Sequence, residues 1–161
     1  DRKGPGKSGP SKLAVGSALP AGLRLTREDG EEVEVAALAA ETGVVFFMYP
    51  KANTPGCTKQ ACGFSDSFKE IEEAGYTVYG LSADNPKPQL NWKTKHNLPY
   101  HLLCDQKRTL ISAFGAGKGD GGTKRSHVIV AKGGKIEDMQ IQVSPGDSVA
   151  KAVEFVKSKG K

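Results

Sequence analysis

Two cysteines, Cys57 and Cys62, are the side chains of this 161-residue chain whose types and spacing most directly indicate chemistry. A thiolate is a strong nucleophile that can be oxidised and reduced reversibly, so an ionised cysteine can serve as a redox centre. A free cysteine can equally be a small buried hydrophobic side chain with no chemical role. The elements that position the two thiols must decide between these interpretations.

The residues around Cys57 predict that it lies where a buried strand hands over to a helix. The unbroken apolar run Val44–Tyr49 is rich in β-branched and aromatic residues, which predicts a strand buried on both faces. Pro55 and Gly56 indicate a turn, and apolar residues then recur at helical spacing, at positions 61, 64, 68 and 71. The first turn of a helix offers free N–H groups and the positive end of the helix dipole, and both favour a thiolate.

Cys62 lies on the same predicted helix as Cys57 but on a different side of it. Five residues turn the helix by roughly 500°, which leaves the two side chains about 140° apart and their Cα atoms about 8–9 Å apart. A disulfide requires Cα atoms no more than about 7 Å apart, so the two thiols cannot bond while the helix is intact. Cys57 is expected to face inward and Cys62 a more solvated side. Local unwinding that joins them would suit a redox cycle rather than a permanent crosslink.

The segment from Tyr49 to Cys62 resembles the active-site signature of peroxiredoxins, in which Pro50, Thr54 and Cys57 hold the characteristic spacing. The whole segment is similar to the peroxiredoxin Q branch, also called the bacterioferritin comigratory protein type. The resemblance extends from about residue 13 to the C-terminus and includes Gly80–Asp84, Asn97–Tyr100 and Arg125–His127. Within the branch the chain is most similar to the nuclear thiol peroxidases of fungi.

This resemblance implies a thioredoxin-dependent peroxidase of antioxidant defence that uses no cofactor and no metal. Cys57 would be the peroxidatic residue, which attacks hydrogen peroxide or an organic hydroperoxide and becomes a sulfenic acid. Cys62 would resolve that sulfenic acid as an intramolecular Cys57–Cys62 disulfide, which thioredoxin would reduce. The groups implied around the substrate are the Thr54 hydroxyl, the backbone N–H groups of Gly56 and Cys57, the Arg125 guanidinium and the shielding ring of Pro50.

Other interpretations of these residues remain open at this point. A thioredoxin-like disulfide reductase would have the same fold class, but such proteins usually carry Cys-x-x-Cys, whereas four residues separate Cys57 from Cys62. A redox-sensing interaction protein that uses the basic chain ends is a further alternative. Arg125 could be a surface charge at the start of a strand instead of a site residue.

The remaining candidate groups are interpreted as structural. None of the histidines, His96, His101 and His127, has metal-ligand spacing to the cysteine pair, so no metal site is expected. His127 is expected to be packed or solvated rather than catalytic, and Cys104 to be a bystander thiol. The segment Gly117–Gly122 has the glycine spacing of a dinucleotide motif, but it follows a predicted helix and precedes a predicted strand. With no helix N-terminus to receive a phosphate, we expect a surface loop there.

The composition predicts one globular domain. Apolar residues make up 37% and charged residues 25% of the chain, and the chain contains no long apolar segment and no secretory signal pattern. These features exclude wholesale disorder and a membrane-spanning helix. Three cysteines in a chain of this length favour a reducing compartment over a disulfide framework, so we expect an intracellular protein of the nucleus or cytoplasm.

The formal net charge of +5 is concentrated at the two chain ends, where residues 1–12 and residues 150–161 each carry four basic residues and one acidic residue. Residues 1–12 are predicted to be a disordered basic tail, and residues 13–161 the folded domain. The tail could instead be a targeting or nucleic-acid-contacting arm, but it has no aromatic residue to stack on bases, so nucleic-acid binding is not expected. Because no cysteine follows the last predicted helix, we expect no intersubunit disulfide and a monomer.

Predicted strands and helices alternate along the chain, which indicates an α/β fold with a central mixed sheet flanked by helices. Before the buried strand we expect a β-hairpin over residues 23–35 with an Asp-Gly turn, then a short helix over residues 35–40. The cysteine helix is expected to run to Ala74, with Gly75 as its C-cap. The later expected elements are a strand at 76–82, a helix at 86–96, a strand at 102–104, a helix capped by Asp105 and ending at Ala113, a hairpin at 126–131 and 136–143, and a helix at 147–159. This order matches the thioredoxin fold with the N-terminal hairpin extension that peroxiredoxins have.

Overall fold

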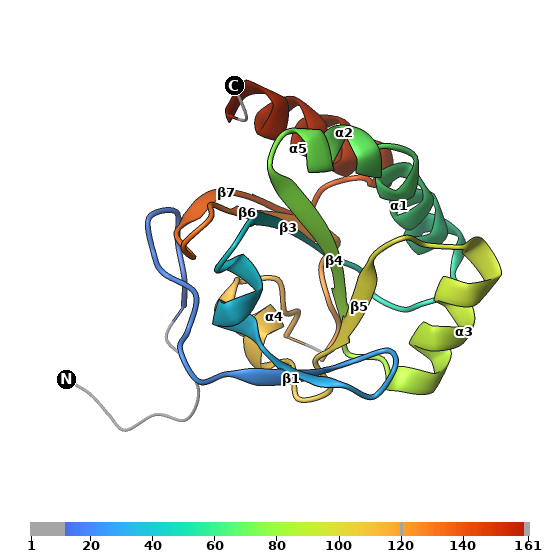
Figure 1. Ribbon diagram of the computed structural model, residues 1–161. Coiled ribbons are helices and arrows are strands. Elements are labelled where there is room, and N and C mark those ends of the chain that lie inside the picture. Colours follow the sequence, from blue (N-terminus) through green and yellow to red (C-terminus); the bar gives the residue numbers. More distant parts are fainter. Residues whose placement is uncertain (1–11, 120, 160–161) are drawn as a thin grey trace.

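The computed structural model describes residues 12–119 and 121–159, which contain the strands, the α-helices and the 3-10 helix shown in Figure 1. In chain order these elements are β1 (Arg24–Arg27), β2 (Glu32–Glu34), η1 (Val35–Ala39), β3 (Gly43–Met48), α1 (Pro55–Asp66), α2 (Phe68–Glu73), β4 (Tyr76–Ser82), α3 (Pro86–His96), β5 (His101–Cys104), α4 (Thr109–Ala113), β6 (Ser126–Val130), β7 (Ile136–Ile141) and α5 (Pro145–Lys159).

The strands form one mixed sheet of seven in the order β2-β1-β5-β4-β3-β6-β7. β3 pairs in parallel with β4, and β4 in parallel with β5, whereas β6 runs antiparallel to β3. Because Met48 pairs with Ser126, the C-terminal end of β3 lies beside the N-terminal end of β6. The predicted α/β architecture, with a thioredoxin-like central sheet between helices, is confirmed.

β3 is buried on both faces because its alternate side chains point into two separate hydrophobic clusters. Val45 and Phe47 pack on the face covered by α1, α2, α3 and α5, and Val44, Phe46 and Met48 pack on the face covered by η1 and α4. Figure 1 shows this division, with α1, α2 and α5 on one side of the sheet and α4 on the other. The strand predicted from the unbroken apolar run is therefore confirmed.

Both predicted hairpins are present. β1 and β2 are joined through a turn in which Gly30 adopts a φ of 87°, and β1 extends the sheet by antiparallel pairing with β5. β6 and β7 are joined through Gly133 and Gly134, whose φ values of 101° and 102° are unfavourable for any residue with a Cβ. The strand over residues 76–82 and the helix over residues 86–96 also have the predicted bounds.

The prediction of one continuous cysteine helix is wrong, because the chain forms α1 and α2 with a break at Ser67. Ser67 has φ −99° and ψ 3°, outside the helical region, and its N–H still bonds back to the carbonyl of Gly63. The break is local, because Phe64 of α1, which stacks on Phe47, and Ile71 of α2 lie in the same buried cluster. The helical spacing of the apolar residues therefore continues across the break.

The helix expected directly after Asp105 begins only at Thr109. Arg108, with a left-handed φ of 57°, turns the chain just before the helix. The Asp105 carboxylate nevertheless accepts hydrogen bonds from the N–H groups of Thr109 (3.0 Å) and Ile111 (2.8 Å). Asp105 thus caps α4 as predicted, but across an intervening turn.

The loop and tail predictions have different outcomes. The described residues of the Gly117–Gly122 segment, 117–119 and 121–122, follow α4 and precede β6, and Gly117 forms an isolated bridge with Thr123, so they lie in a loop as expected. The predicted basic tail lies outside the described residues except for Lys12, and its disorder stays a prediction. None of the helices in the described part of the chain has the length and apolar character needed to cross a membrane.

Candidate active site

Cys57 is the third residue of α1 and its side chain is 1% exposed, facing the core as predicted. Pro55 occupies the first helical position, where the missing N–H has no intrahelical acceptor to lose. The N–H groups of Gly56 and Cys57 follow directly, at the helix end where backbone donors lack intrahelical partners. The thiol therefore lies beside free donors and the positive end of the helix dipole.

The loop that carries the chain from β3 to α1 is anchored to the neighbouring strand β4. The N–H of Ala52 donates to Asp84 Oδ2 at 2.7 Å, and the same oxygen accepts a hydrogen bond from the Ser82 hydroxyl at 2.8 Å. Tyr49, just before the loop, donates its buried hydroxyl to Gln89 of α3. These bonds tie the loop to the sheet and to α3, so the start of α1 has a defined position.

Arg125 lies against the first turn of α1, and its guanidinium contacts the Cys57 sulfur. Its Nη1 donates to Cys57 Sγ at 3.4 Å and to Gln60 Oε1 at 3.2 Å. A Cβ on residue 56 would lie 2.8 Å from Arg125 Nη2, so Gly56 leaves the space that the guanidinium occupies. Arg125 immediately precedes β6, and the pairing of β6 with β3 brings it to this end of the sheet.

Thr54 and Pro50 lie in the loop that joins β3 to α1. Thr54 is the N-cap residue of α1, and its hydroxyl donates to the carbonyl oxygen of Lys51 at 2.8 Å. To donate to a substrate, the hydroxyl must exchange this hydrogen bond for a new one. Pro50 is solvent-exposed, at the rim of the loop.

Cys62 lies further along α1, is partly exposed and is not bonded to Cys57. Burial, followed by the negative charge of Asp66, raises the pKa of the Cys62 thiol above its usual value. Cys62 is therefore held mainly as a thiol at neutral pH while the helix is intact. The sequence prediction that Cys57 faces inward and Cys62 a more solvated side is confirmed.

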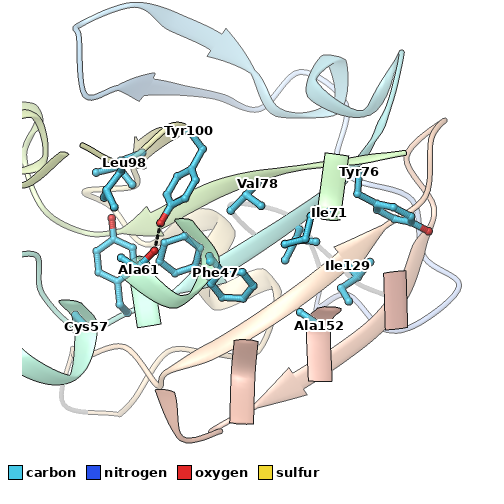
Figure 2. Packing of buried hydrophobic residues seen from close by; sticks show 14 of the residues in the cluster. Phe47, Cys57, Ala61, Ile71, Tyr76, Val78, Leu98, Tyr100, Ile129 and Ala152 are labelled. Atoms are coloured by element: carbon cyan, nitrogen blue, oxygen red, sulfur yellow. Dashed lines mark hydrogen bonds between the residues drawn. The ribbon is translucent and has the colours of Figure 1, made fainter. Parts of the chain in front are cut away.

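Two aromatic side chains pin the first two turns of α1. The indole N–H of Trp92 on α3 donates to Thr58 Oγ1 at 3.1 Å, and the Tyr100 hydroxyl donates to the carbonyl of Ala61 at 2.5 Å. Figure 2 shows the second of these bonds, with Tyr100 reaching the helix that carries Cys57. Neither contact is predictable from a local pattern, because Trp92 and Thr58 are 34 positions apart in the chain and Tyr100 and Ala61 are 39 positions apart.

A buried polar side chain, Gln60, was also not identified from the sequence. The sequence feature that could have indicated it is an amide three residues after Cys57, on the inner side of α1 among apolar neighbours. In the structure the Gln60 side chain is completely buried. His127 is packed rather than solvated, one of the two outcomes expected for it, with no exposed surface. Burial, followed by the positive charge of Lys151, lowers the pKa of His127 to about 4, so the ring is neutral near pH 7.

Cys104 and His101, both on β5, lie apart from this arrangement. Cys104 is buried on β5, where it pairs with Ser82 and Thr26, and burial raises its pKa to about 11. Within the described residues, the group with ligand atoms close enough for a metal is Glu28, Asp29 and His101. Glu28 already accepts hydrogen bonds from His101 and from the N–H of Leu102, so this group holds β1 to β5.

Comparisons with known proteins give a consistent result. Residues 15–139 match the sequence profile of the AhpC/TSA family. The chain is 47% identical over 148 residues to Peroxiredoxin bcp1 of Schizosaccharomyces pombe, covering 91% of this chain and 75% of that protein. It is 34% identical over 152 residues to Peroxiredoxin Bcp of Bacillus subtilis, covering 90% and 96% of the two chains. Among solved structures, Peroxidoxin BcpB of Mycobacterium tuberculosis superposes with a TM-score of 0.84 at 28% identity, covering 89% of this chain and 96% of that one.

Proposed function

This chain belongs to the AhpC/TSA family, in its branch of Bcp and peroxiredoxin Q proteins, and we propose that Cys57 carries the thiol peroxidase activity of that branch. The surroundings of the Cys57 sulfur support this assignment. A buried thiol at a helix N-terminus has the Arg125 guanidinium at 3.4 Å, and a guanidinium stays charged at any physiological pH. The negative sulfur is thereby favoured where a hydroperoxide would meet it.

In the proposed first step, the thiolate sulfur of Cys57 attacks one oxygen of a hydroperoxide, ROOH. The S–O bond forms as the O–O bond breaks, two electrons pass from sulfur to the peroxide, and ROH leaves after taking up a proton. Negative charge develops on the departing oxygen, where Arg125 and the N–H groups of Gly56 and Cys57 would stabilise it. Thr54 would exchange its bond to Lys51 for one to the substrate, and Pro50 would shield the sulfenic acid at the rim.

Replacement of Arg125 by methionine is expected to slow the reaction of Cys57 with hydrogen peroxide about 100-fold, the typical loss when one transition-state donor is removed. Lysine at this position keeps the charge but lacks the planar guanidinium with its fixed donors, so Arg125→Lys should fall between wild type and Arg125→Met. Stopped-flow mixing of reduced protein with excess peroxide measures the rate constant. Arg24→Met, in an exposed ion pair with Glu32, is the control. A wild-type rate constant in Arg125→Met would show that Arg125 takes no part in the reaction of Cys57 with peroxide.

In the proposed second step, the Cys62 thiolate attacks the sulfur of the Cys57 sulfenic acid. The S–S bond forms, the S–O bond breaks, and the oxygen leaves as water after protonation. The first turn of α1 must unwind for the sulfurs to meet, because helical geometry keeps the Cα atoms too far apart. A dithiol protein, thioredoxin, would then supply two electrons and two protons to restore both thiols.

The rate of this second step is expected to rise with pH from about 7 to 9, because only the thiolate attacks and burial raises the pKa of Cys62. Asp66 is the second cause of the raised pKa and is solvent-exposed, so its effect is screened. Asp66→Asn should therefore accelerate disulfide formation at pH 7 by about twofold, measured by trapping free thiols after a peroxide pulse. Glu73→Gln, an exposed charge on α2, should leave the rate unchanged. A pH-independent rate would show that thiol ionisation does not limit this step.

We further propose thioredoxin as the physiological reductant, a monomer as the working form, and residence inside the cell, in the nucleus or cytoplasm. The thiol reductant follows from family membership. The monomer rests on the spacing of Cys57 and Cys62, which suits a disulfide formed within one chain, and the location rests on the small number of cysteines in the sequence.

A tryptic disulfide map before and after one equivalent of peroxide tests the proposed function. The expected product links Cys57 to Cys62 and leaves Cys104 free. If Cys57 and Cys62 stay unlinked and unoxidised, the assignment of both residues is wrong. If Cys57 is found linked to Cys104, the resolving role passes from Cys62 to Cys104.

A further inference from the structure

A line of hydrogen bonds continues from the Arg125 guanidinium into the protein interior. Arg125 Nη1 donates to Gln60 Oε1 at 3.2 Å, and Gln60 Nε2 donates to Ser148 Oγ at 3.1 Å. Ser148 Oγ lies 2.8 Å from Nδ1 of His127. Gln60, Ser148 and His127 are completely buried, and they come from α1, α5 and β6 respectively. Three elements distant in sequence thus meet in one polar line that ends at the Cys57 sulfur.

The directions of these bonds follow from the protonation state of His127. The charged groups that face its ring are Asp138 of β7, whose Oδ2 is 3.9 Å from Nε2, and Lys151 of α5. Burial keeps the ring neutral near pH 7, because its pKa is lowered to about 4. The Asp138 carboxylate beside Nε2 favours the tautomer that carries its hydrogen on Nε2, so Nδ1 of His127 accepts the one hydrogen of the Ser148 hydroxyl. The Ser148 oxygen can then only accept a hydrogen bond from Gln60.

This direction determines which end of the Gln60 amide meets Arg125. With the amide nitrogen donating to Ser148, the amide oxygen faces the guanidinium and accepts from it. A flipped amide would direct its NH₂ group at the guanidinium, two donors facing each other, and would leave buried groups without partners. Unpaired buried polar groups are unfavourable, so the flipped arrangement is excluded as long as His127 and Ser148 hold their places.

We propose that His127 and Ser148 are positioning residues of the peroxidatic site, which act by holding the Gln60 amide so that its oxygen fixes the Arg125 guanidinium beside Cys57. This inference rests on the proposed function of Cys57. It assigns a role to a histidine that does not touch the sulfur and whose Nε2 has no hydrogen-bond partner among the described residues. A buried imidazole with one nitrogen unpaired is a poor choice for packing alone, since an apolar side chain of similar size avoids that cost.

The test is made in a background that carries Cys62→Ser and Cys104→Ser, so that Cys57 is the one remaining thiol. Ser148→Ala removes the hydroxyl that accepts from the Gln60 amide nitrogen, so the amide loses the bond that holds it in place beside Arg125. We expect the rate constant with hydrogen peroxide to fall about tenfold, the usual weight of one hydrogen bond that positions a charged group. The thiolate absorbance of Cys57 at pH 7 should fall with it, and the pH profile of its alkylation should move to higher pH.

Ser148→Thr keeps the hydroxyl and should restore both the rate and the alkylation profile. Ser158→Ala is the matched control, because Ser158 is an exposed serine on the same helix that bonds only to the carbonyl of Phe155. His127→Leu removes the acceptor without removing a hydroxyl, and it should reproduce the Ser148→Ala profile even if Ser148→Ala folds poorly. Neither a general loss of stability nor a change in helix α5 would produce this set of results.

The outcomes separate this inference from the proposed function. If the parent protein does not react with peroxide, the proposed function fails. If the parent reacts and both Ser148→Ala and His127→Leu match it in rate and alkylation profile, the positioning role is wrong while the peroxidase function stands. A lowered melting temperature with an unchanged profile would likewise assign His127 and Ser148 to structure alone.

Discussion

Cys57→Ser is expected to lower hydroperoxide consumption by about four orders of magnitude or more, to the level of the uncatalysed reaction. A serine hydroxyl does not ionise near pH 7, so neither the helix N-terminus nor the Arg125 guanidinium at 3.4 Å can create a nucleophile there. A smaller hydroxyl fits the space of the buried thiol, so the fold should be retained. Peroxide consumption with excess dithiol, read alongside the circular dichroism spectrum, measures both quantities.

Cys104→Ser is the matched control for this experiment. Cys104 is also buried, but burial raises its pKa to about 11 and no cationic side chain contacts its sulfur in the described structure. The variant should consume peroxide at the wild-type rate. Residual turnover in Cys57→Ser that disappears only when Cys104 is also replaced would mean that the reactive thiol has been assigned to the wrong residue.

Cys62→Ser is expected to show the second-largest effect, which is one turnover without recycling. The reaction of Cys57 with peroxide needs the intact first turn of α1, which serine at position 62 leaves in place. The sulfenic acid would then have no intramolecular partner, and no disulfide would form for thioredoxin to reduce. A burst of one equivalent of peroxide consumed per chain, followed by negligible thioredoxin-dependent turnover, is the expected result. Wild-type recycling in this variant would exclude Cys62 from the resolving role.

Trp92 provides a direct optical signal for the same experiment, because it is the one tryptophan of the chain and its indole donates to Thr58 beside Cys57. Unwinding of the first turn breaks this bond, so wild-type fluorescence should change when the disulfide forms. Cys62→Ser should lack that change after oxidation. Peroxide reduction and disulfide formation therefore require different conformations of α1.

The local pattern of the sequence was sufficient to predict the elements that present Cys57. An apolar run of β-branched and aromatic residues favours a strand covered on both sides, and β3 is such a strand. Proline and glycine before Cys57 start a helix, and helical periodicity alone separates Cys57 from Cys62. These properties depend on residues close together in the chain, so they can be predicted without knowledge of the tertiary structure.

The tertiary structure alone decided what surrounds the thiol. The register of β6 on β3 brings Arg125 to Cys57 across 68 positions of sequence, and no local pattern encodes that register. The local pattern did not predict the break at Ser67, and α4 starts only at Thr109 because Arg108 turns the chain in a left-handed conformation just before it. Gln60 meets Ser148 across 88 positions, so the buried polar line from His127 to Arg125 exists only once α5 closes over α1. A hydrogen bond between distant elements depends on the direction of each donor and acceptor in space, which periodicity does not specify.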